Sequence, residues 1–103
     1  MRPSPGPDRF RSLPRRRALG LDVPVATHHR ARLLGLAWLP RERAGAGLLL
    51  PHCACVHTFG MRFELDLVFL DADDRPLSVF HRLPPRRLAW QRGAAAVLEI
   101  PSP

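Results

Sequence analysis

Residues 62–83, RFELDLVFLDADDRPLSVFHRL, hold the clearest secondary-structure pattern in the chain. Two sets of side chains alternate along the first half: Phe63, Leu65, Leu67 and Phe69 on one side, and Glu64, Asp66, Val68 and Leu70 on the other. A period of two is typical of a strand. The residues DADDRP then favour a turn, and the apolar positions Leu77 and Val79 resume the same period. This segment therefore predicts a β-hairpin.

The flanking segments predict further short elements. GLLL (47–50) and AAAVLEI (94–100) are typical of strands, although the Ala run could equally begin as a helical turn. Pro51 favours an edge strand, a bulge or a strand end. Residues 23–26 predict another short strand, followed by a helix over residues 28–36 with Thr27 as its N-cap. Ala31, Leu34 and Trp38 would form the apolar side of that helix. Together these elements predict a small, mainly β single-domain fold, a β-sandwich or barrel-like fold with one or two short helices.

Length and composition limit the chain to one domain, because 103 residues with 46% apolar content build a single small core. Residues 1–21 are rich in Arg and Pro and lack apolar periodicity, so we predict a disordered N-terminal tail before a domain over residues 22–103. Of the net charge of +7, the first twenty residues carry six Arg and one acid, or +5, and the rest carry ten Arg and eight acids, or +2. The tail therefore predicts weak, non-specific binding to polyanions.

Targeting signals are weak in this sequence. The stretch PRRRALGL (14–21) is similar to a twin-arginine export signal, but Asp22 and Pro24 interrupt the apolar run that would follow. No apolar run approaches the ~20 residues of a membrane-spanning helix. We therefore expect a cytoplasmic protein without a membrane span, in which the two cysteines need not be oxidised.

Residues 52–58, HCACVHT, concentrate the reactive side chains. In an extended strand, Cys53, Cys55 and His57 would share one face at about 6.6 Å intervals, which is the basis of a metal-site hypothesis. A second hypothesis makes Cys53 a nucleophile, with His57 as base and Asp66 as the residue that orients it. An extended strand would separate Cys53 from His57 by about 13 Å, which is too far for a hydrogen bond.

A structural interpretation of the same segment receives most weight. Cys53 would pack as a small apolar side chain, while His57 and Thr58 would stabilise the junction between a strand and the following loop. Asp66 would then be a structural carboxylate held by loop N–H groups or by Arg87. We therefore expect a non-enzymatic binding or accessory protein without a cofactor. The alternative is a small enzyme or metal-binding protein that uses Cys53, His57 and Asp66.

The order of these motifs resembles a family of bacterial and archaeal proteins known as domain of unknown function 192 (DUF192). The resemblance covers about residues 25–101. Its specific positions are Cys53, Val56, His57, Thr58, Met61, Asp66, Phe69, Leu70 and Asp71, followed by Pro85, Arg87, Leu98 and Glu99. Thr58, Met61, Arg87 and Glu99 thereby become candidate structural or ligand-binding residues. The resemblance implies a compact β-rich fold and names no reaction.

Overall fold

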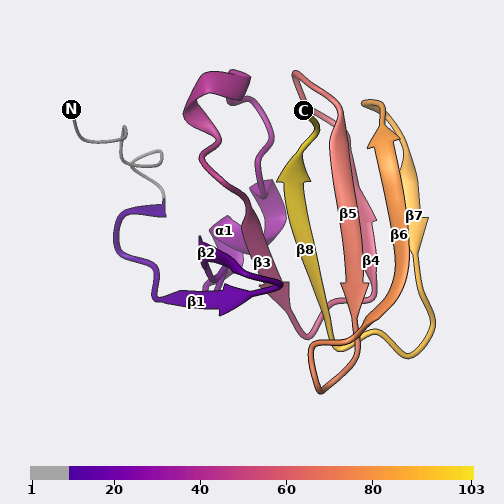
Figure 1. The fold of residues 1–103 in the computed structure, drawn as a ribbon. Helices are drawn as coiled ribbons and strands as arrows, with labels where there is room; N and C mark the ends of the chain where they lie inside the picture. Colours follow the sequence, from indigo (N-terminus) through magenta and orange to yellow (C-terminus); the bar gives the residue numbers. More distant parts are fainter. Residues whose placement is uncertain (1–9) are drawn as a thin grey trace.

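The computed structural model describes residues 10–103, which are centred on a four-stranded antiparallel sheet in the order β3-β8-β5-β6 (Figure 1). Its strands are β3 (Leu48–Pro51), β8 (Ala96–Pro101), β5 (Leu65–Leu70) and β6 (Pro76–Leu83). The last strand in the sequence thus lies between the first and second strands of this sheet. The predicted mainly β fold is confirmed.

Strands β5 and β6 form the predicted hairpin. The carboxylate of Asp71 accepts hydrogen bonds from the backbone N–H groups of Asp73 and Arg75, at 2.8 and 2.9 Å. Such bonds from an aspartate to the backbone just after it favour a tight turn. The predicted alternation is also confirmed for the inner face, since Leu65, Leu67 and Phe69 are completely buried there.

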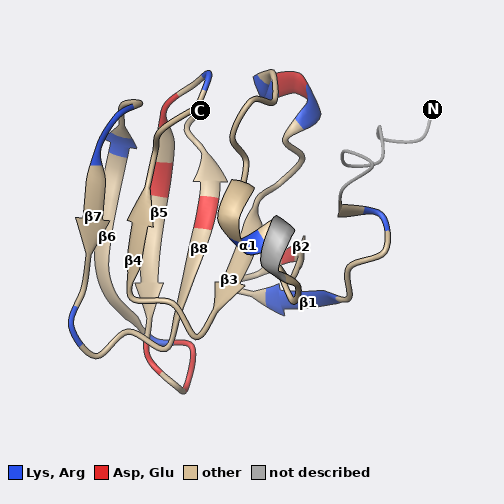
Figure 2. Ribbon diagram, turned by 180° about the vertical axis from the view of Figure 1, so that it is seen from behind, with Lys and Arg blue, Asp and Glu red and all other residues tan. Residues whose placement is uncertain are grey.

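A second layer covers that inner face. It consists of the helix α1 (His29–Leu34) and a two-stranded ribbon, β4 (Cys55–His57) with β7 (Leu88–Trp90), which lie in front of the sheet in Figure 2. The buried side chains that fill the space between the layers come from both of them: Ala31, Leu36, Val56 and Ala89 meet Leu48, Leu50, Leu65, Leu67, Phe69 and Val97. Burial of this apolar surface is the main stabilising term of the fold.

The opposite face of the sheet is covered by a hairpin of β1 (Arg15–Ala18) and β2 (Leu21–Pro24). Ala18 and Val23 pack there in a second apolar cluster with side chains of the sheet. A short turn of 3-10 helix, η2 (Arg41–Arg43), precedes β3. Within residues 10–103, no helix combines the length and apolar character needed to cross a membrane.

The predicted disorder of residues 1–21 is wrong for residues 10–21. Phe10 and Leu13 are buried, at 5% and 6% exposure, and β1 pairs with β2. Two of the arginines taken for a solvated tail form ion pairs, Arg15 with Asp22 and Arg16 with Asp74. Isolated apolar residues between prolines and arginines carry no period, so sequence patterns missed their burial. Residues 1–9 of the predicted tail lie outside the described residues.

The predicted helix was too long and wrongly capped. Observed α1 begins at His29 after His28 as N-cap, without a side-chain capping bond, so Thr27 does not serve as the cap. It ends at Gly35, whose φ of +52° is a conformation that glycine adopts readily. Trp38, predicted on the apolar side of the helix, is 68% exposed because it lies beyond this helix end.

Candidate functional site

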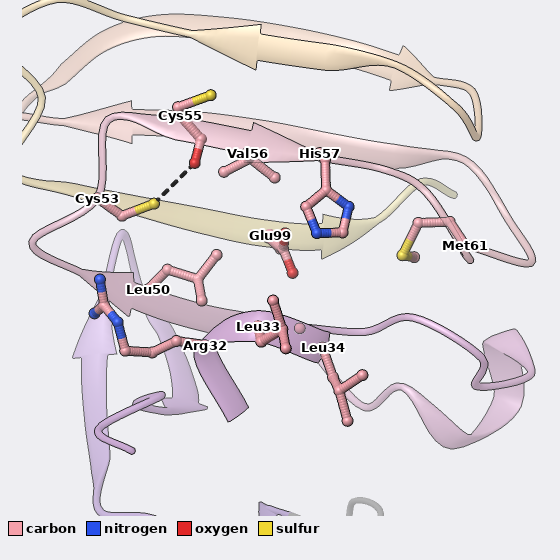
Figure 3. A pocket seen from close by; sticks show the side chains of 11 residues that line it. Arg32, Leu33, Leu34, Leu50, Cys53, Cys55, Val56, His57, Met61 and Glu99 are labelled. Carbon is pink, nitrogen blue, oxygen red and sulfur yellow. Dashed lines mark hydrogen bonds between the residues drawn. The ribbon is translucent and has the colours of Figure 1, made fainter. Parts of the chain in front are cut away.

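A cavity of about 60 Å³ lies between α1, the segment 53–61 and the sheet (Figure 3). This volume accommodates a few water molecules or a small organic group, since one water needs roughly 10–15 Å³ by the same measure. Apolar side chains form much of its wall: Leu33, Leu34, Leu50, Val56 and Met61. The other lining residues are Arg32, Gly35, Cys53, Cys55, His57 and Glu99.

Glu99 supplies the buried acidic group of this cavity. It lies in β8, where it pairs with Leu48 on one side and with Leu67 on the other. The residue is only 3% exposed. A Cβ atom at Gly35 would lie 2.8 Å from Glu99 Oε1, so the absence of a side chain at Gly35 lets the helix end approach the carboxylate. The sheet and the helix together fix the carboxylate at the cavity.

Cys53 borders the same cavity from the loop between β3 and β4. Arg32 of α1 fixes the start of this loop by donating hydrogen bonds to the backbone oxygens of Pro51 and His52. The half-buried thiol donates to the backbone oxygen of Cys55 at 3.1 Å. Burial is the largest cause that raises the pKa of the Cys53 thiol, and together with the nearby Glu99 and Cys55 it outweighs the opposing effects of the Cys55 bond and the Arg32 charge. Cys53 is therefore a neutral thiol near pH 7.

The predicted common face of Cys53, Cys55 and His57 is absent. His52 has a φ of +52°, and β4 begins only at Cys55, so residues 53–57 are not one extended strand. The thiol of Cys55 points away from the cavity while that of Cys53 borders it (Figure 3). Among the side chains that the structure describes, which leave out those of residues 1–9, 29 and 30, no three His, Cys, Asp or Glu residues are grouped so as to hold one metal ion.

His57 and Met61 lie with Cys53 and Glu99 around the cavity. Figure 3 shows the imidazole of His57 directed from the end of β4 toward Glu99. His57 is exposed and its ring lies 5.9 Å from the ring of Phe59, whereas Met61 is buried. Five of the candidate residues thus line the cavity, counting Cys55, although no sequence spacing links the segment 53–61 to Glu99.

Asp66 lies elsewhere. It is one residue away from Leu67, so it projects from the opposite face of β5, where it pairs with Ile100. Its carboxylate accepts hydrogen bonds from Ser102 Oγ at 2.6 Å and from the backbone N–H of Arg82 at 2.9 Å. The predicted partners, loop N–H groups near His57 or the guanidinium of Arg87, were wrong because they belong to the other layer.

The electrostatics of Asp66 follow from these bonds. Partial burial acts to raise the pKa of its carboxyl group, but the bonds from Ser102 and Arg82 and the neighbouring His81 act in the other direction. Their combined effect prevails, so the pKa of Asp66 lies below its usual value. Asp66 is an ionised carboxylate at neutral pH, and it lies on the face of the sheet opposite His57.

Thr58 connects the end of β4 to the loop before β7. Its completely buried hydroxyl accepts a hydrogen bond from Arg87 N–H at 2.8 Å and donates one to the backbone oxygen of Pro84 at 2.7 Å. The backbone N–H of Thr58 also donates to the backbone oxygen of Arg87 at 2.9 Å. Arg87 therefore enters this network through its backbone, while its exposed side chain lies outside the cavity.

Sequence reasoning missed Arg32 and Gly35 as residues of the site. Arg32 was not among the candidate residues, but its guanidinium binds the loop before Cys53. The position of Gly35 directly after the apolar residues Leu33 and Leu34 could have indicated a helix end there, since glycine commonly ends helices. Nothing in the sequence indicated that Glu99 would face this glycine.

The fold and cavity define a small two-layer β domain with a pocket between its layers. The chain belongs to the DUF192 family, whose model, described as uncharacterized ACR, matches residues 13–102. No match was found among curated proteins.

Two solved structures share this fold. A protein of unknown function from Novosphingobium aromaticivorans DSM 12444 is 22% identical with a TM-score of 0.63, over 78% of this chain and 62% of that one. The chain thus spans less than two thirds of that protein. A protein from Sinorhizobium meliloti 1021, provisionally described as a transcription regulator, is 20% identical with a TM-score of 0.70, over 80% of this chain and 69% of that one.

Proposed function

We propose that this chain is a non-enzymatic binding domain that holds a small ligand in the cavity between α1, the segment 53–61 and β8. The observation that carries the proposal is the carboxyl group of Glu99, 3% exposed, beside a cavity with largely apolar walls. A few polar groups in an apolar cavity are the usual composition of a small-molecule site. Glu99 would contact the ligand alongside its contacts within the chain.

The positions of the reactive side chains favour binding over catalysis. A thiol nucleophile reacts as the thiolate, and burial raises the pKa of Cys53. Asp66, the third member of the hypothetical triad, projects from the opposite face of the sheet. The arrangement therefore lacks both the activated nucleophile and the aligned acid that thiol catalysis requires.

The chemistry of the cavity limits the ligand. Its volume of about 60 Å³ suits a group of a few non-hydrogen atoms. A carboxyl group among apolar side chains selects a group that donates hydrogen bonds, and a protonated amine does so most strongly. The domain would thus bind a small amine, or the amine end of a larger molecule.

In the same proposal, HCACVHT is a structural junction that also forms one wall of the cavity. Two hydrogen bonds of the Thr58 hydroxyl support this role, one donated to the backbone oxygen of Pro84 and one accepted from Arg87 N–H, because they join the end of β4 to the loop that leads into β7. The bond from Cys53 to Cys55 supports it as well, since it closes the loop that borders the ligand.

The test is a nuclear magnetic resonance titration of the ¹⁵N-labelled chain with methylammonium chloride. We expect saturable shifts at the amides of Gly35, Val56 and Glu99, their loss in Glu99→Gln, and their retention in Glu42→Gln, which changes an exposed acid in η2. Tetramethylammonium, which has the charge but no N–H donor, should not cause them. Absence of saturable shifts with methylammonium, methylguanidinium and acetamide would contradict the proposal, as would shifts unchanged by Glu99→Gln.

A further inference from the structure

The ribbon of β4 and β7 has an exposed apolar side that faces away from the core. Val56 and Ala89 turn inward, at 5% and 2% exposure. The neighbours of Ala89 in β7 turn outward, and Leu88 is 59% exposed and Trp90 68% exposed. Large apolar side chains this exposed on a regular strand contribute little to the stability of the domain.

Phe59 extends this surface beyond the end of β4. It is 52% exposed, and it follows by two residues His57, whose backbone pairs with Leu88 in the ribbon. Cys55, also exposed, lies opposite Trp90. We call Phe59, Leu88 and Trp90 the outer apolar face.

Arginines surround the outer apolar face. Residues 52–62 and 82–95, which form the ribbon and its adjoining loops, contain five exposed arginines and no acidic residue, a net charge of +5: Arg62, Arg82, Arg86, Arg87 and Arg92. Figure 2 shows basic residues on the segments before and after β7 and no acidic residue on β4 or β7. Among the residues described, none of the ion pairs involves these five guanidinium groups.

The loop that carries two of these arginines is held in place from within the domain. Thr58 binds the backbone of Arg87 through its hydroxyl and its N–H, and its backbone oxygen accepts a hydrogen bond from Arg86 N–H at 3.2 Å. A loop fixed in this way loses little conformational freedom when a partner binds.

We infer that the outer apolar face and its arginines form a docking surface for an acidic amphipathic peptide segment of another protein. An apolar centre with tryptophan, surrounded by arginine, is the typical composition of a protein interface. Alternate side chains of an extended peptide recur at about 6.6 Å, the same spacing as Leu88 and Trp90, so its apolar residues would pack on them while its carboxylates meet the arginines.

Charge and side-chain composition favour a peptide over the other occupants. A second copy of this chain, docked through the same surface, would place its net charge of +5 against the net charge of +5 on the first copy. Like charges oppose such a pairing. A single-stranded nucleic acid would satisfy the charge, but its bases bind by stacking on flat aromatic rings. Leu88 has no ring, so this face offers aromatic stacking only at Phe59 and Trp90. The inference extends beyond the proposed small-molecule site, because Glu99 lies inside the cavity and not on this face.

The experiment measures fluorescence anisotropy of a labelled peptide in which glutamate alternates with leucine and phenylalanine, titrated with the full chain. We expect Leu88→Thr and Trp90→Thr each to weaken binding about tenfold, as interface centres do. Leu77→Thr is the matched control, since Leu77 is an exposed strand leucine in β6 at 43% exposure. Arg92→Gln should weaken binding severalfold and reduce its salt dependence, whereas Arg43→Gln in η2 should not.

Further probes separate the alternatives. Circular dichroism confirms that each variant is folded. Glu99→Gln should leave peptide binding unchanged, so this inference and the proposed function fail independently. If oligoglutamate binds as tightly as the peptide that contains leucine and phenylalanine, the inference is contradicted, because the outer apolar face then contributes nothing to binding. If the chain binds oligothymidylate more tightly than the peptide, and Trp90→Thr abolishes that binding, the partner is a nucleic acid. If the chain self-associates and Leu88→Thr abolishes the association, the partner is a second copy of the chain.

Discussion

Asp66 and Glu99 lie on opposite faces of the same four-stranded sheet. Glu99 pairs with Leu67 across β5 and β8, while Asp66, one residue earlier, pairs with Ile100. Because successive strand residues project to opposite faces, this shift of one residue separates the two carboxylates. Glu99 lies at the cavity beside Cys53, whereas Asp66 accepts a hydrogen bond from Ser102, which directly follows the neighbouring strand β8. This separation also places Asp66 on the face of the sheet opposite Cys53 and His57.

Asp66→Asn should reduce the free energy of unfolding by about 1–3 kcal/mol, because an amide replaces a charged acceptor of the Ser102 and Arg82 bonds. The side chain is 18% exposed, so solvent compensates only in part. Urea denaturation measures the loss. Asp73→Asn is the matched control, since Asp73 is exposed in the β5–β6 turn and should change stability little. Equal losses at both positions would show that the Asp66 bonds contribute nothing.

The stabilisation by Asp66 should depend on pH in one direction. The folded-state pKa of Asp66 is lowered, so its contribution is fully present above the unfolded value of about 3.9 and is lost as the pH falls through the folded value. The stability difference between the wild type and Asp66→Asn should therefore be constant near neutral pH and shrink below about pH 4. Denaturation across this range measures it, in a His81→Gln background that removes the neighbouring titrating group. A difference in unfolding free energy between the two proteins that grows toward low pH would contradict the predicted direction of the pH dependence.

Thr58→Val should destabilise the domain by about 1–3 kcal/mol, because it leaves the buried N–H of Arg87 and the oxygen of Pro84 without their hydroxyl partner. Thr58→Ser is the control. It retains the hydroxyl and loses one methyl group, so its cost should be about 1 kcal/mol. Chemical denaturation compares the two variants. If valine is tolerated better than serine, packing and not hydrogen bonding accounts for the role of Thr58.

Phe10→Ala should lower stability by about 3 kcal/mol or more, because Phe10 is 5% exposed within the main core. Deletion of residues 1–21 should destabilise the domain further, since it removes β1 and uncovers one face of the sheet. Thermal melting measures both effects. Leu77→Ala, at an exposed strand position, is the control. Unchanged melting after the deletion would restore the original expectation of a tail that is independent of the fold.

Gly35→Ala should cost at least about 1 kcal/mol more than Gly93→Ala. Both glycines have positive φ, +52° and +84°, so both substitutions impose backbone strain. Only at Gly35 would the new Cβ meet another group, Glu99 Oε1 at 2.8 Å, whereas Gly93 has open space around it. Comparison of the two unfolding free energies isolates the contact with Glu99. Equal costs would mean that the carboxylate moves aside freely.

The sequence predicted the elements of the fold better than their ends. Alternating apolar residues identified β5 and β6, since half-buried strands carry a period of two over many residues. Phe10 and Leu13 carried no period, because each fills a gap in the core from an irregular segment. The exposure of Trp38 depended on where the helix ended, and helix ends are weakly encoded.

The site was predicted as a set of residues and not as an arrangement. Cys53, His57, Met61 and Glu99 were all identified, but their meeting depends on the placement of β8 between β3 and β5, which no local pattern specifies. The assumption of an extended strand through Cys53 failed because residues 52–54 turn before β4 begins. The face on which Asp66 lies was predictable from alternation, whereas its partner Ser102, 36 positions away, was not.

The most direct test of binding against catalysis is the alkylation rate of Cys53 by iodoacetamide as a function of pH, in a Cys55→Ser background. Because burial raises the pKa of the Cys53 thiol, we predict slower reaction near pH 7 than for N-acetylcysteine amide. The rate should rise only at alkaline pH and should be unaffected by Asp66→Asn. Rapid alkylation at neutral pH that His57→Ala and Asp66→Asn both suppress would contradict the account and establish a thiol mechanism.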